Sequence, residues 1–284
     1  MSTTREDDLL GRVCLVTGAT SGIGREIARG LALKRAHVIV ASRDAARGRQ
    51  VADELSDDTA NPQVEAIELD LASQASIRRF AADFTKRFTK LHVLVNCAGV
   101  YAPTREKTVD GIERTWATNV LGYFLPTVLL LDMLVASAPA RIVNVASSAA
   151  GGLDLDDVEF ARRKYGGMAA YRQSKQADRM LTWGLAARLR DRGVTANAMH
   201  PGYVRTSLIR EGAFGFFFRL GGLFARSPAW GADTAIWLAS SGAMREDTGG
   251  YYVDRKEKHC PFRDEDALDR LWKLCEAMTQ ARTA

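Results

Sequence analysis

The sequence predicts an α/β fold, a doubly wound parallel sheet in a single domain over residues 1–284. Two observations support this prediction. Strand-like and helix-like segments alternate from one end of the chain to the other, as they do in folds built from strand–helix–strand units. Most of the strand-like segments are short continuous apolar runs, which are typical of parallel strands buried on both faces.

The expected elements follow from these runs and from the amphipathic stretches between them. We expect about seven strands, at residues 12–19, 37–42, 64–71, 91–99, 140–147, 194–202 and 249–254. Helical periodicity is clear at residues 24–35, 74–88 and 169–180. Two segments are additions to this frame: residues 153–167, an insertion before the last of these helices, and residues 207–228, which hold three consecutive phenylalanines.

The composition narrows the function classes. The net charge is +5, and 39 basic residues are scattered among 34 acidic ones, so no nucleic-acid partner is expected. The four cysteines and four histidines are dispersed without ligand-like spacing, so no metal site is expected. The N-terminus is polar and acidic, and no apolar run reaches the ~18 residues that span a bilayer. We therefore expect a cytoplasmic protein without a transmembrane segment.

A glycine-rich turn, TGATSGIG, joins the first strand to the first helix at residues 17–24. Glycines at 18, 22 and 24 permit a tight turn and a close approach of a ligand's phosphates. The N–H groups at the start of the helix attract a pyrophosphate. The predicted phosphate site comprises Gly18, Thr20, Ser21, Gly22, Ile23 and Gly24. The alternative is that these glycines serve packing alone.

The end of the second strand indicates which dinucleotide binds. An acidic residue there would accept hydrogen bonds from the ribose 2′-OH of NAD, whereas this chain has Ser42 followed by Arg43. A guanidinium pairs with a 2′-phosphate and stacks on adenine, so NADP(H) is favoured. Asp44 weakens this argument, and Arg43 could also be a solvated side chain at the start of a loop.

Further cofactor contacts are expected where the third and fourth strands end, because ligands bind at the carboxyl edge of open sheets. The candidates are Asp70, Leu71, Asn96, Ala98 and Gly99. An aspartate after a strand is also often only a helix cap.

A tyrosine and a lysine four residues apart mark the helix AAYRQSKQADRM at residues 169–180. Tyr171 and Lys175 lie on one helix face, and we expect no acidic residue to be placed to pair with the lysine. Taken alone, they could be an incidental pair on an exposed face. Ser147 and Ser148 end the fifth strand at the same edge of the sheet, within reach of this helix.

These groups together fit oxidation and reduction of a carbonyl. A cation beside a phenol stabilises the phenolate, so the phenol can exchange a proton with the substrate oxygen. A serine hydroxyl can hold the same oxygen, and the hydride belongs to the nicotinamide.

Several motifs fall in order along the chain. They are TGATSGIG, NCAG at residues 96–99, Asn119, the serine pair at 147–148, Tyr-x-x-x-Lys and Pro201-Gly202. Over roughly residues 12–254 the chain resembles the short-chain dehydrogenase/reductases, which have a Rossmann fold. By this resemblance Tyr171 is the acid/base, Lys175 also binds the nicotinamide ribose, and Ser147, three residues after Asn144, orients the substrate.

The resemblance also implies roles for residues that carry no clear signal by themselves. Asn119 would hold a water in the proton relay; without the family it is a polar residue in a helix, or the position of a kink. The residues expected beside the nicotinamide are Pro201, Gly202, Val204 and Thr206.

A narrower likeness is to the retinol dehydrogenase-like branch. It rests on the interval between Ser147 and Tyr171, the run at residues 227–240 and the tail after residue 249. This resemblance implies NADP preference and lipophilic alcohols or aldehydes. Residues 213–224, AFGFFFRLGGLF, fit a lid over such a substrate. Core or dimer packing and a shallow peripheral membrane contact are the alternatives.

The sequence thus predicts an NADP(H)-dependent oxidoreductase that acts on a bulky lipophilic carbonyl or alcohol. The alternatives are a non-catalytic dinucleotide-binding regulator, a reductase of small polar carbonyls, and an epimerase or dehydratase on the same frame. A homo-oligomer could form through the helices around residues 109–135 and 171–190, although their apolar residues could equally face the sheet.

Overall fold

The computed structural model describes residues 8–204 and 226–282, and its strands form one sheet. The strand order is β3-β2-β1-β4-β5-β6-β7-β8. The strands are β1 (Val13–Thr17), β2 (His37–Ser42), β3 (Val64–Glu68), β4 (Val93–Asn96), β5 (Ala140–Val145), β6 (Val194–His200), β7 (Tyr251–Val253) and β8 (Lys256–Glu257). Each neighbouring pair from β3 to β7 is parallel. This confirms the predicted doubly wound α/β fold.

The eighth strand is the part of the sheet that the apolar runs did not indicate. β8 has two exposed residues and pairs antiparallel with β7. Asp254 and Arg255, between the two strands, both have positive φ, which matches the two-residue turn that suits a hairpin.

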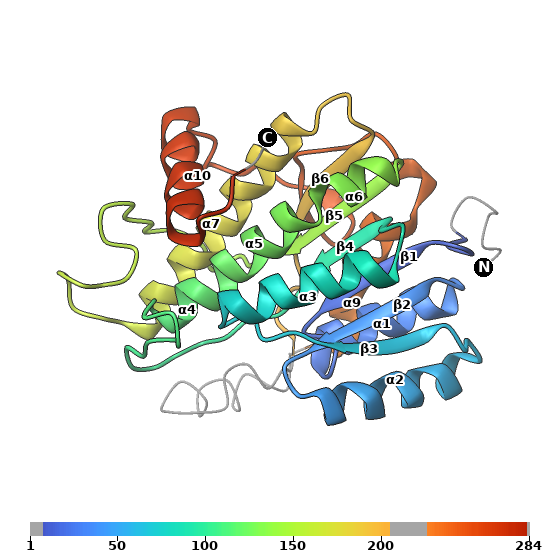
Figure 1. The fold of residues 1–284 in the computed structure, drawn as a ribbon. Coiled ribbons are helices and arrows are strands. Elements are labelled where there is room, and N and C mark those ends of the chain that lie inside the picture. The colour runs from blue at the N-terminus through green and yellow to red at the C-terminus, as the bar shows by residue number, and fades with distance from the viewer. Residues whose placement is uncertain (1–7, 205–225, 283–284) are drawn as a thin grey trace.

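Helices cover both faces of the sheet (Figure 1). On one face lie α1 (Gly22–Leu33), α2 (Ala45–Thr59) and α9 (Pro228–Ser240). On the other lie α3 (Gln74–Arg87), α4 (Arg114–Trp116), α5 (Gly122–Leu129), α6 (Leu131–Ala136) and α7 (Gly167–Arg188). The last helix, α10 (Glu265–Thr279), lies beside α7.

Successive residues of one strand enter different cores. Leu15 and Ile39 pack under α3, α5 and α7, whereas Cys14, Val16 and Val38 pack under α1 and α9. A strand with a core on each face needs apolar side chains in both directions. This explains the continuous apolar runs of the sequence.

α10 packs against α7 and α5. The Trp272 ring lies 5.0 Å from that of Phe124, edge to face. Gly184 of α7 allows this approach, because a Cβ there would stand 3.0 Å from the Trp272 ring. α10 therefore covers part of α7, one of the helices through which a homo-oligomer could have formed.

Most of the predicted lid, residues 207–225, lies outside the described residues. The end of that segment begins a helix, because the Ser227 hydroxyl caps α9 by accepting the N–H of Trp230.

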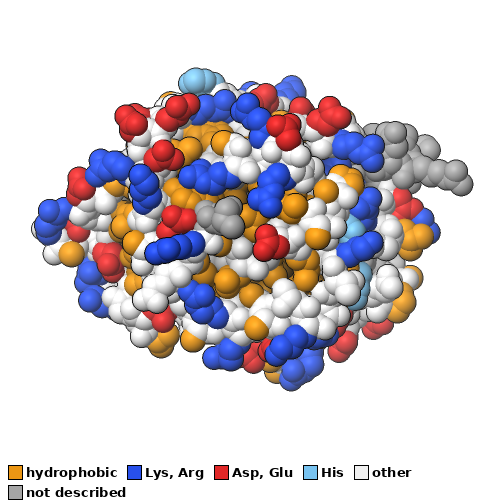
Figure 2. All heavy atoms as spheres, turned by 45° about the horizontal axis from the view of Figure 1, so that its top comes forward, with side chains coloured by type: hydrophobic (Ala, Val, Ile, Leu, Met, Phe, Trp, Pro, Cys, Tyr) orange, Lys and Arg blue, Asp and Glu red, His pale blue; other side chains and the backbone are white. Residues whose placement is uncertain are grey.

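One face of the molecule is seen in Figure 2. Basic and acidic side chains are interspersed there around a central apolar area. Among the described helices, none is both long and apolar enough to cross a membrane.

Candidate active site

The turn after β1 packs tightly against the end of β4. Gly18 has φ +67°, and a Cβ on it would stand 2.6 Å from the Cα of Ala98. A Cβ on Gly24 would stand 2.3 Å from the Gly18 carbonyl oxygen. Side chains at these positions would push the turn away from the sheet. The glycines therefore serve close packing, which holds the N-terminus of α1 at the strand ends.

The start of α1 has the features of an anion site. Ser21 is the N-cap residue, and its side chain makes no capping hydrogen bond. The first N–H groups of a helix have no partner within the helix and carry its positive dipole end. No acidic residue lies in the first turn of α1. A pyrophosphate would be favoured here.

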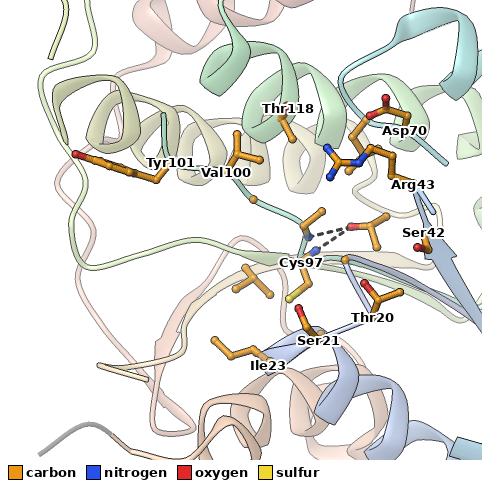
Figure 3. Close-up of a pocket in the computed structure, with 18 of the residues that line it drawn as sticks. Thr20, Ser21, Ile23, Ser42, Arg43, Asp70, Cys97, Val100, Tyr101 and Thr118 are labelled. Atoms are coloured by element: carbon orange, nitrogen blue, oxygen red, sulfur yellow. Dashed lines mark hydrogen bonds between the residues drawn. The ribbon is translucent and has the colours of Figure 1, made fainter. Parts of the chain in front are cut away.

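A cavity of about 760 Å³ opens at the carboxyl ends of the strands and brings most of the predicted site together (Figure 3). Its lining includes Gly18, Thr20, Ser21, Gly22, Ile23, Gly24, Ser42, Arg43, Asp70, Leu71, Ala98, Gly99, Tyr171, Lys175 and Pro201. The Thr17 hydroxyl accepts the N–H groups of Cys97 and Ala98, which ties the end of β1 to the end of β4.

Four predicted cofactor residues are not part of this lining. Asn96 is fully buried, and its amide donates to the side chains of Thr127 and Asn144. A Cβ on Gly202 would meet the Trp230 ring at 2.6 Å. The other two are Val204, which is buried, and Thr206, which lies outside the described residues.

Two arginines line the end of the cavity near β2. Figure 3 shows Arg43 reaching over the cavity toward Asp70. Arg47, in the first turn of α2, also lines the cavity and was not predicted. The sequence could have indicated Arg47, because it stands only four residues after Arg43. The Asp44 carboxylate caps α2 by accepting the N–H of Arg47 at 3.0 Å, so it already has a structural role.

The turn after β3 excludes one alternative for Asp70. The N-cap of α3 is Ser73, whose hydroxyl accepts the N–H of Ser76. Asp70 instead accepts the N–H of Ala72 at 3.0 Å and lines the cavity. It is not the cap of this helix.

Lys175 is buried and does have a carboxylate partner, so the expectation that it lacks one was wrong. Its ammonium donates to Asp178 Oδ2 at 2.8 Å and to the Val145 carbonyl at 3.1 Å. Asp178 lies three residues further along α7, on the same face. Although burial lowers the pKa of the ammonium, the Asp178 carboxylate is the strongest opposing influence, and the pKa of Lys175 is held above its usual value.

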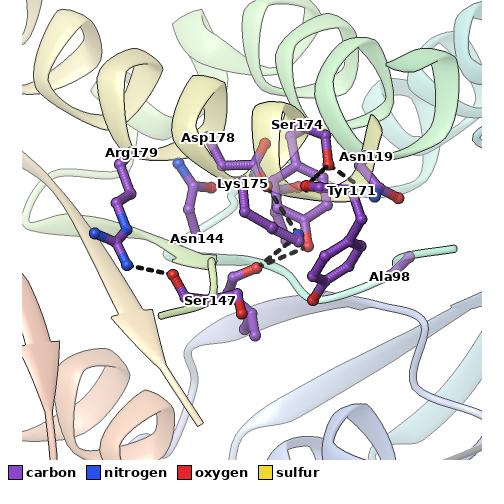
Figure 4. A network of polar contacts seen from close by, with 12 residues as sticks. Ala98, Asn119, Asn144, Ser147, Tyr171, Ser174, Lys175, Asp178 and Arg179 are labelled. Carbon is purple, nitrogen blue, oxygen red and sulfur yellow. Dashed lines mark hydrogen bonds and ion pairs between the residues drawn. The ribbon is translucent and has the colours of Figure 1, made fainter. Parts of the chain in front are cut away.

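Ser147 is held by two hydrogen bonds. Its Oγ accepts the N–H of Ala149 at 3.1 Å, so the hydroxyl proton is left to donate elsewhere. Its carbonyl accepts from the guanidinium of Arg179, which also donates to the Tyr251 hydroxyl at 2.7 Å. Figure 4 shows Tyr171 pointing from α7 toward the strand end that carries Ser147. Arg179 was not predicted, although it stands one turn after Lys175.

Asn119 lies in a π-helical turn at residues 117–121, so the helix is indeed irregular there. Such turns are frequent at functional sites. Its Oδ1 accepts the N–H of Val100 at 2.8 Å, and its amide donates to the Val100 carbonyl and to Ser174 Oγ, each at 3.1 Å. Both amide hydrogens are thus committed to the protein. The predicted contact to a water would have to use another atom of this residue.

The comparisons with known proteins agree with this geometry. Residues 12–212 match the family described as short chain dehydrogenase. The chain belongs to this family. Retinol dehydrogenase 12 of Homo sapiens is 40% identical over 276 residues, covering 95% of this chain and 87% of that protein. Retinol dehydrogenase 13 of Homo sapiens is 41% identical over 274 residues, covering 92% and 82%.

Solved structures share the fold. A protein from Mycobacterium paratuberculosis superposes with a TM-score of 0.79 at 32% identity, covering 98% of this chain and 96% of that one. RhlG of Pseudomonas aeruginosa, solved in complex with NADP, gives a TM-score of 0.72 at 30% identity, covering 88% and 96%. This short-chain dehydrogenase is thus an oxidoreductase related to the retinol dehydrogenases.

The insertion at residues 153–167 braces the wall of the dehydrogenase's cavity. The Tyr165 hydroxyl donates toward the Ala102 carbonyl at 3.0 Å and the Glu113 carboxylate at 3.2 Å. Glu113 is fully buried and caps α4 through the N–H groups of Thr115 and Trp116. The insertion therefore fixes the loop that follows β4, one side of which lines the cavity.

Proposed function

We propose that this enzyme transfers a hydride between NADP(H) and the carbonyl or alcohol of a bulky lipophilic substrate. The observation that carries the proposal is the convergence of Tyr171, Lys175 and the glycine turn on one cavity of about 760 Å³. A cavity of this size accommodates a dinucleotide and leaves its catalytic end accessible.

NADP(H) is proposed over NAD(H) because of charge. Arg43 and Arg47 both line the cavity beside the end of β2, where the strand ends in Ser42 rather than in an acidic residue. Two guanidinium groups favour a 2′-phosphate, which a carboxylate would repel. Asp44 is engaged as a helix cap. The NADP complex of RhlG, a structural relative, is consistent with this choice.

The residues present suit a nicotinamide dinucleotide, whose nicotinamide supplies or accepts the hydride when bound. The N-terminus of α1 would hold the pyrophosphate. Tyr171 would pass a proton to or from the substrate oxygen, and the free hydroxyl proton of Ser147 would hold that oxygen. Lys175 would stabilise the phenolate of Tyr171 and contact the ribose. Asn119 would keep Val100 and Ser174 in place beside them.

A lipophilic substrate is proposed because of the side chains at residues 100–103, which line the cavity. Val100, Tyr101, Ala102 and Pro103, whose side chains are largely apolar, line the cavity. Relatives about 40% identical are named retinol dehydrogenases. The proposed lid at 213–224 would add apolar surface to the cavity, and it falls outside the described residues.

The test is oxidation of NADPH and NADH by the full-length enzyme against aldehydes and ketones graded in size and polarity. We expect turnover of the larger apolar carbonyls with NADPH. Turnover confined to small polar carbonyls would support the alternative function, a reductase of small polar carbonyls. The Glu106–Arg114 ion pair, whose residues both line the cavity, favours this alternative. Tight NADPH binding with no turnover of any carbonyl would contradict the proposal.

A further inference from the structure

Asp178 forms an ion pair with Lys175, and it is among the most deeply buried charged groups of the described chain. The residue is 1% exposed and Lys175 is 3% exposed, with 2.8 Å between Nζ and Oδ2 (Figure 4). Within the described residues, its other oxygen, Oδ1, has no hydrogen-bond partner. Asp178 also lines a small cavity, whose other lining residues include Tyr123, Phe124 and Leu181.

Stability alone gives little reason for this arrangement. Removing two charges from water costs more than most buried ion pairs return, and an apolar pair of similar volume is often as stable. A carboxylate with one unsatisfied oxygen makes that cost larger. Burial raises the pKa of Asp178 to about 6 even though Lys175 opposes the shift. A buried charge kept at such cost beside a reactive group is a candidate for a functional role.

The ammonium of Lys175 needs a counterion to stay charged where it lies. Desolvation is the largest influence on it and favours the neutral amine, whereas Asp178 is the strongest influence in the other direction. Fully buried lysines without a partner can be neutral near pH 7. The Val145 carbonyl fixes the second ammonium hydrogen, which leaves the third for the cavity.

Among residues 8–204 and 226–282, the other titratable groups that influence the pair supply no negative charge in the working range. Tyr123 faces it from α5, Cys97 from the end of β4 and Cys275 from α10. Burial raises the pKa of Cys97 to about 12 and holds those of Tyr123 and Cys275 above their ordinary values, so these three groups stay neutral. Tyr171 lies on the same helix as the pair.

We propose that Asp178 is a positioning residue that keeps Lys175 protonated and seated against Val145, so that the lysine can stabilise the phenolate of Tyr171. This inference rests on the proposed role of Tyr171 and Lys175 in proton transfer. It adds the buried Asp178 carboxylate, as the counterion of Lys175, to the groups of this active site. Asp178 acts only through Lys175 and contacts neither substrate nor cofactor.

The test is Asp178→Asn, which keeps the shape and one acceptor oxygen but removes the charge. Lys175 is followed by NMR of selectively labelled lysine, its signal assigned by its loss in Lys175→Arg. We expect the lysine to lose its proton about two pH units or more below the wild-type midpoint. In turnover, kcat should match the wild type below about pH 6, where Asp178 itself is neutral, and fall progressively behind as the pH rises.

The controls separate charge from structure. Asp178→Glu keeps the charge and should keep Lys175 protonated. Thr182→Val, on the next turn of α7, removes a buried hydroxyl that bonds Asn144 and the Asp178 carbonyl, and it should leave the lysine titration unchanged. If Asp178→Asn does not fold, Asp178→Ser also removes the charge, and the titration of Lys175 is measured in that variant.

The lysine titration needs no substrate, so it is independent of whether the carbonyl panel shows turnover. An unchanged Lys175 midpoint in the neutral variants would overturn the inference even in an active enzyme. A kcat lowered by the same factor at every pH would also overturn it, since that is the mark of a purely structural role.

Discussion

Single side chains set the charge at the two ends of the cavity. Near β2, Arg43 and Arg47 both line it, and the neighbouring Asp44 is engaged as a helix cap. At the catalytic end, Lys175 carries the positive charge and Asp178 compensates it. The first end would select the cofactor, and the second would govern proton transfer.

The cofactor preference leads to a prediction for the two arginines. Arg43→Ala and Arg47→Ala should each weaken NADPH binding about 10- to 100-fold, because each removes a charge-assisted contact to the 2′-phosphate. NADH affinity should barely change. Titration calorimetry or fluorescence with both cofactors measures the ratio.

Arg49→Ala is the matched control, since Arg49 is exposed on the same helix and does not line the cavity. Equal loss of NADPH and NADH affinity in the Arg43 and Arg47 variants would mean that these side chains serve the fold and not the phosphate.

Some of these residues could be predicted from the sequence, and others could not. Tyr171 and Lys175 follow from helix spacing, and the glycine turn follows from its place after β1. Asp178 and Arg179 stand in the same twelve-residue stretch but were overlooked, because their roles depend on how α7 packs. Asp178 meets the lysine at i+3, whereas Arg179 meets Ser147 and Tyr251, which are distant in sequence.

At the scale of elements, the insertion before α7 supports the substrate end of the cavity. Gln173 of α7 donates to the Val158 carbonyl, and Tyr165 donates to the Ala102 carbonyl. Burial raises the pKa of Tyr165 to about 12, so its hydroxyl stays a donor at any working pH. The insertion thus links α7 to the loop after β4.

Removing one hydroxyl tests this link. Tyr165→Phe should raise KM for the carbonyl substrate several-fold, since the loop at Ala102 loses its tie, and should lower the free energy of unfolding by about 1 kcal/mol. The affinity for NADPH should not change. Steady-state kinetics and denaturant unfolding give the three values.

Tyr203→Phe is the control, because Tyr203 is 70% exposed. If Tyr165→Phe changed the NADPH affinity as much as the carbonyl KM, the insertion would brace the whole site and not the substrate end.

The regular elements were predictable because each strand lies between two cores, which gives its continuous apolar run. The π-helical turn around Asn119 was not, because its cause is long-range. The side chain of Asn119 bonds Val100 and Ser174, which come from two other segments. β8 was missed because a two-residue exposed strand leaves no apolar pattern.

At the scale of the whole molecule, two histidines of the described chain have lowered pKa values, the buried His92 and the half-buried His200. Burial lowers the pKa of His92 to about 4, with repulsion from Arg12 and Lys90 adding to the effect. Its Nδ1 accepts the N–H of Val13 at 3.0 Å, a bond that the neutral ring makes. Burial likewise lowers the pKa of His200 to about 4. The stability that these histidines contribute is present above their unfolded pKa, and it is lost as the pH falls toward 4.

Asp178 has the opposite effect on stability over the same pH range. Its folded pKa is raised, so its contribution to stability is present at low pH and is lost as the pH rises through about 6. Between about pH 7 and pH 5, the stability lost through the two histidines is larger than the stability gained through Asp178. The free energy of unfolding should fall by about 2 kcal/mol.

Denaturant unfolding across this range measures the slope. His92→Gln, whose amide oxygen can replace Nδ1 as acceptor, should flatten it, whereas His259→Gln, at an exposed position, should not. A stability that rose steadily toward pH 5 would show that the histidines are not held neutral.

In the proposed mechanism, Tyr171 exchanges the proton while the rest of the cavity binds the cofactor. The most direct measurement compares wild type and Tyr171→Phe for NADPH affinity and for single-turnover reduction of the best carbonyl in the panel. We predict unchanged NADPH affinity and a rate lower by about 10²–10⁴-fold, the usual contribution of general acid catalysis. A variant that reduced the carbonyl at the wild-type rate would rule out Tyr171 as the group that exchanges the proton.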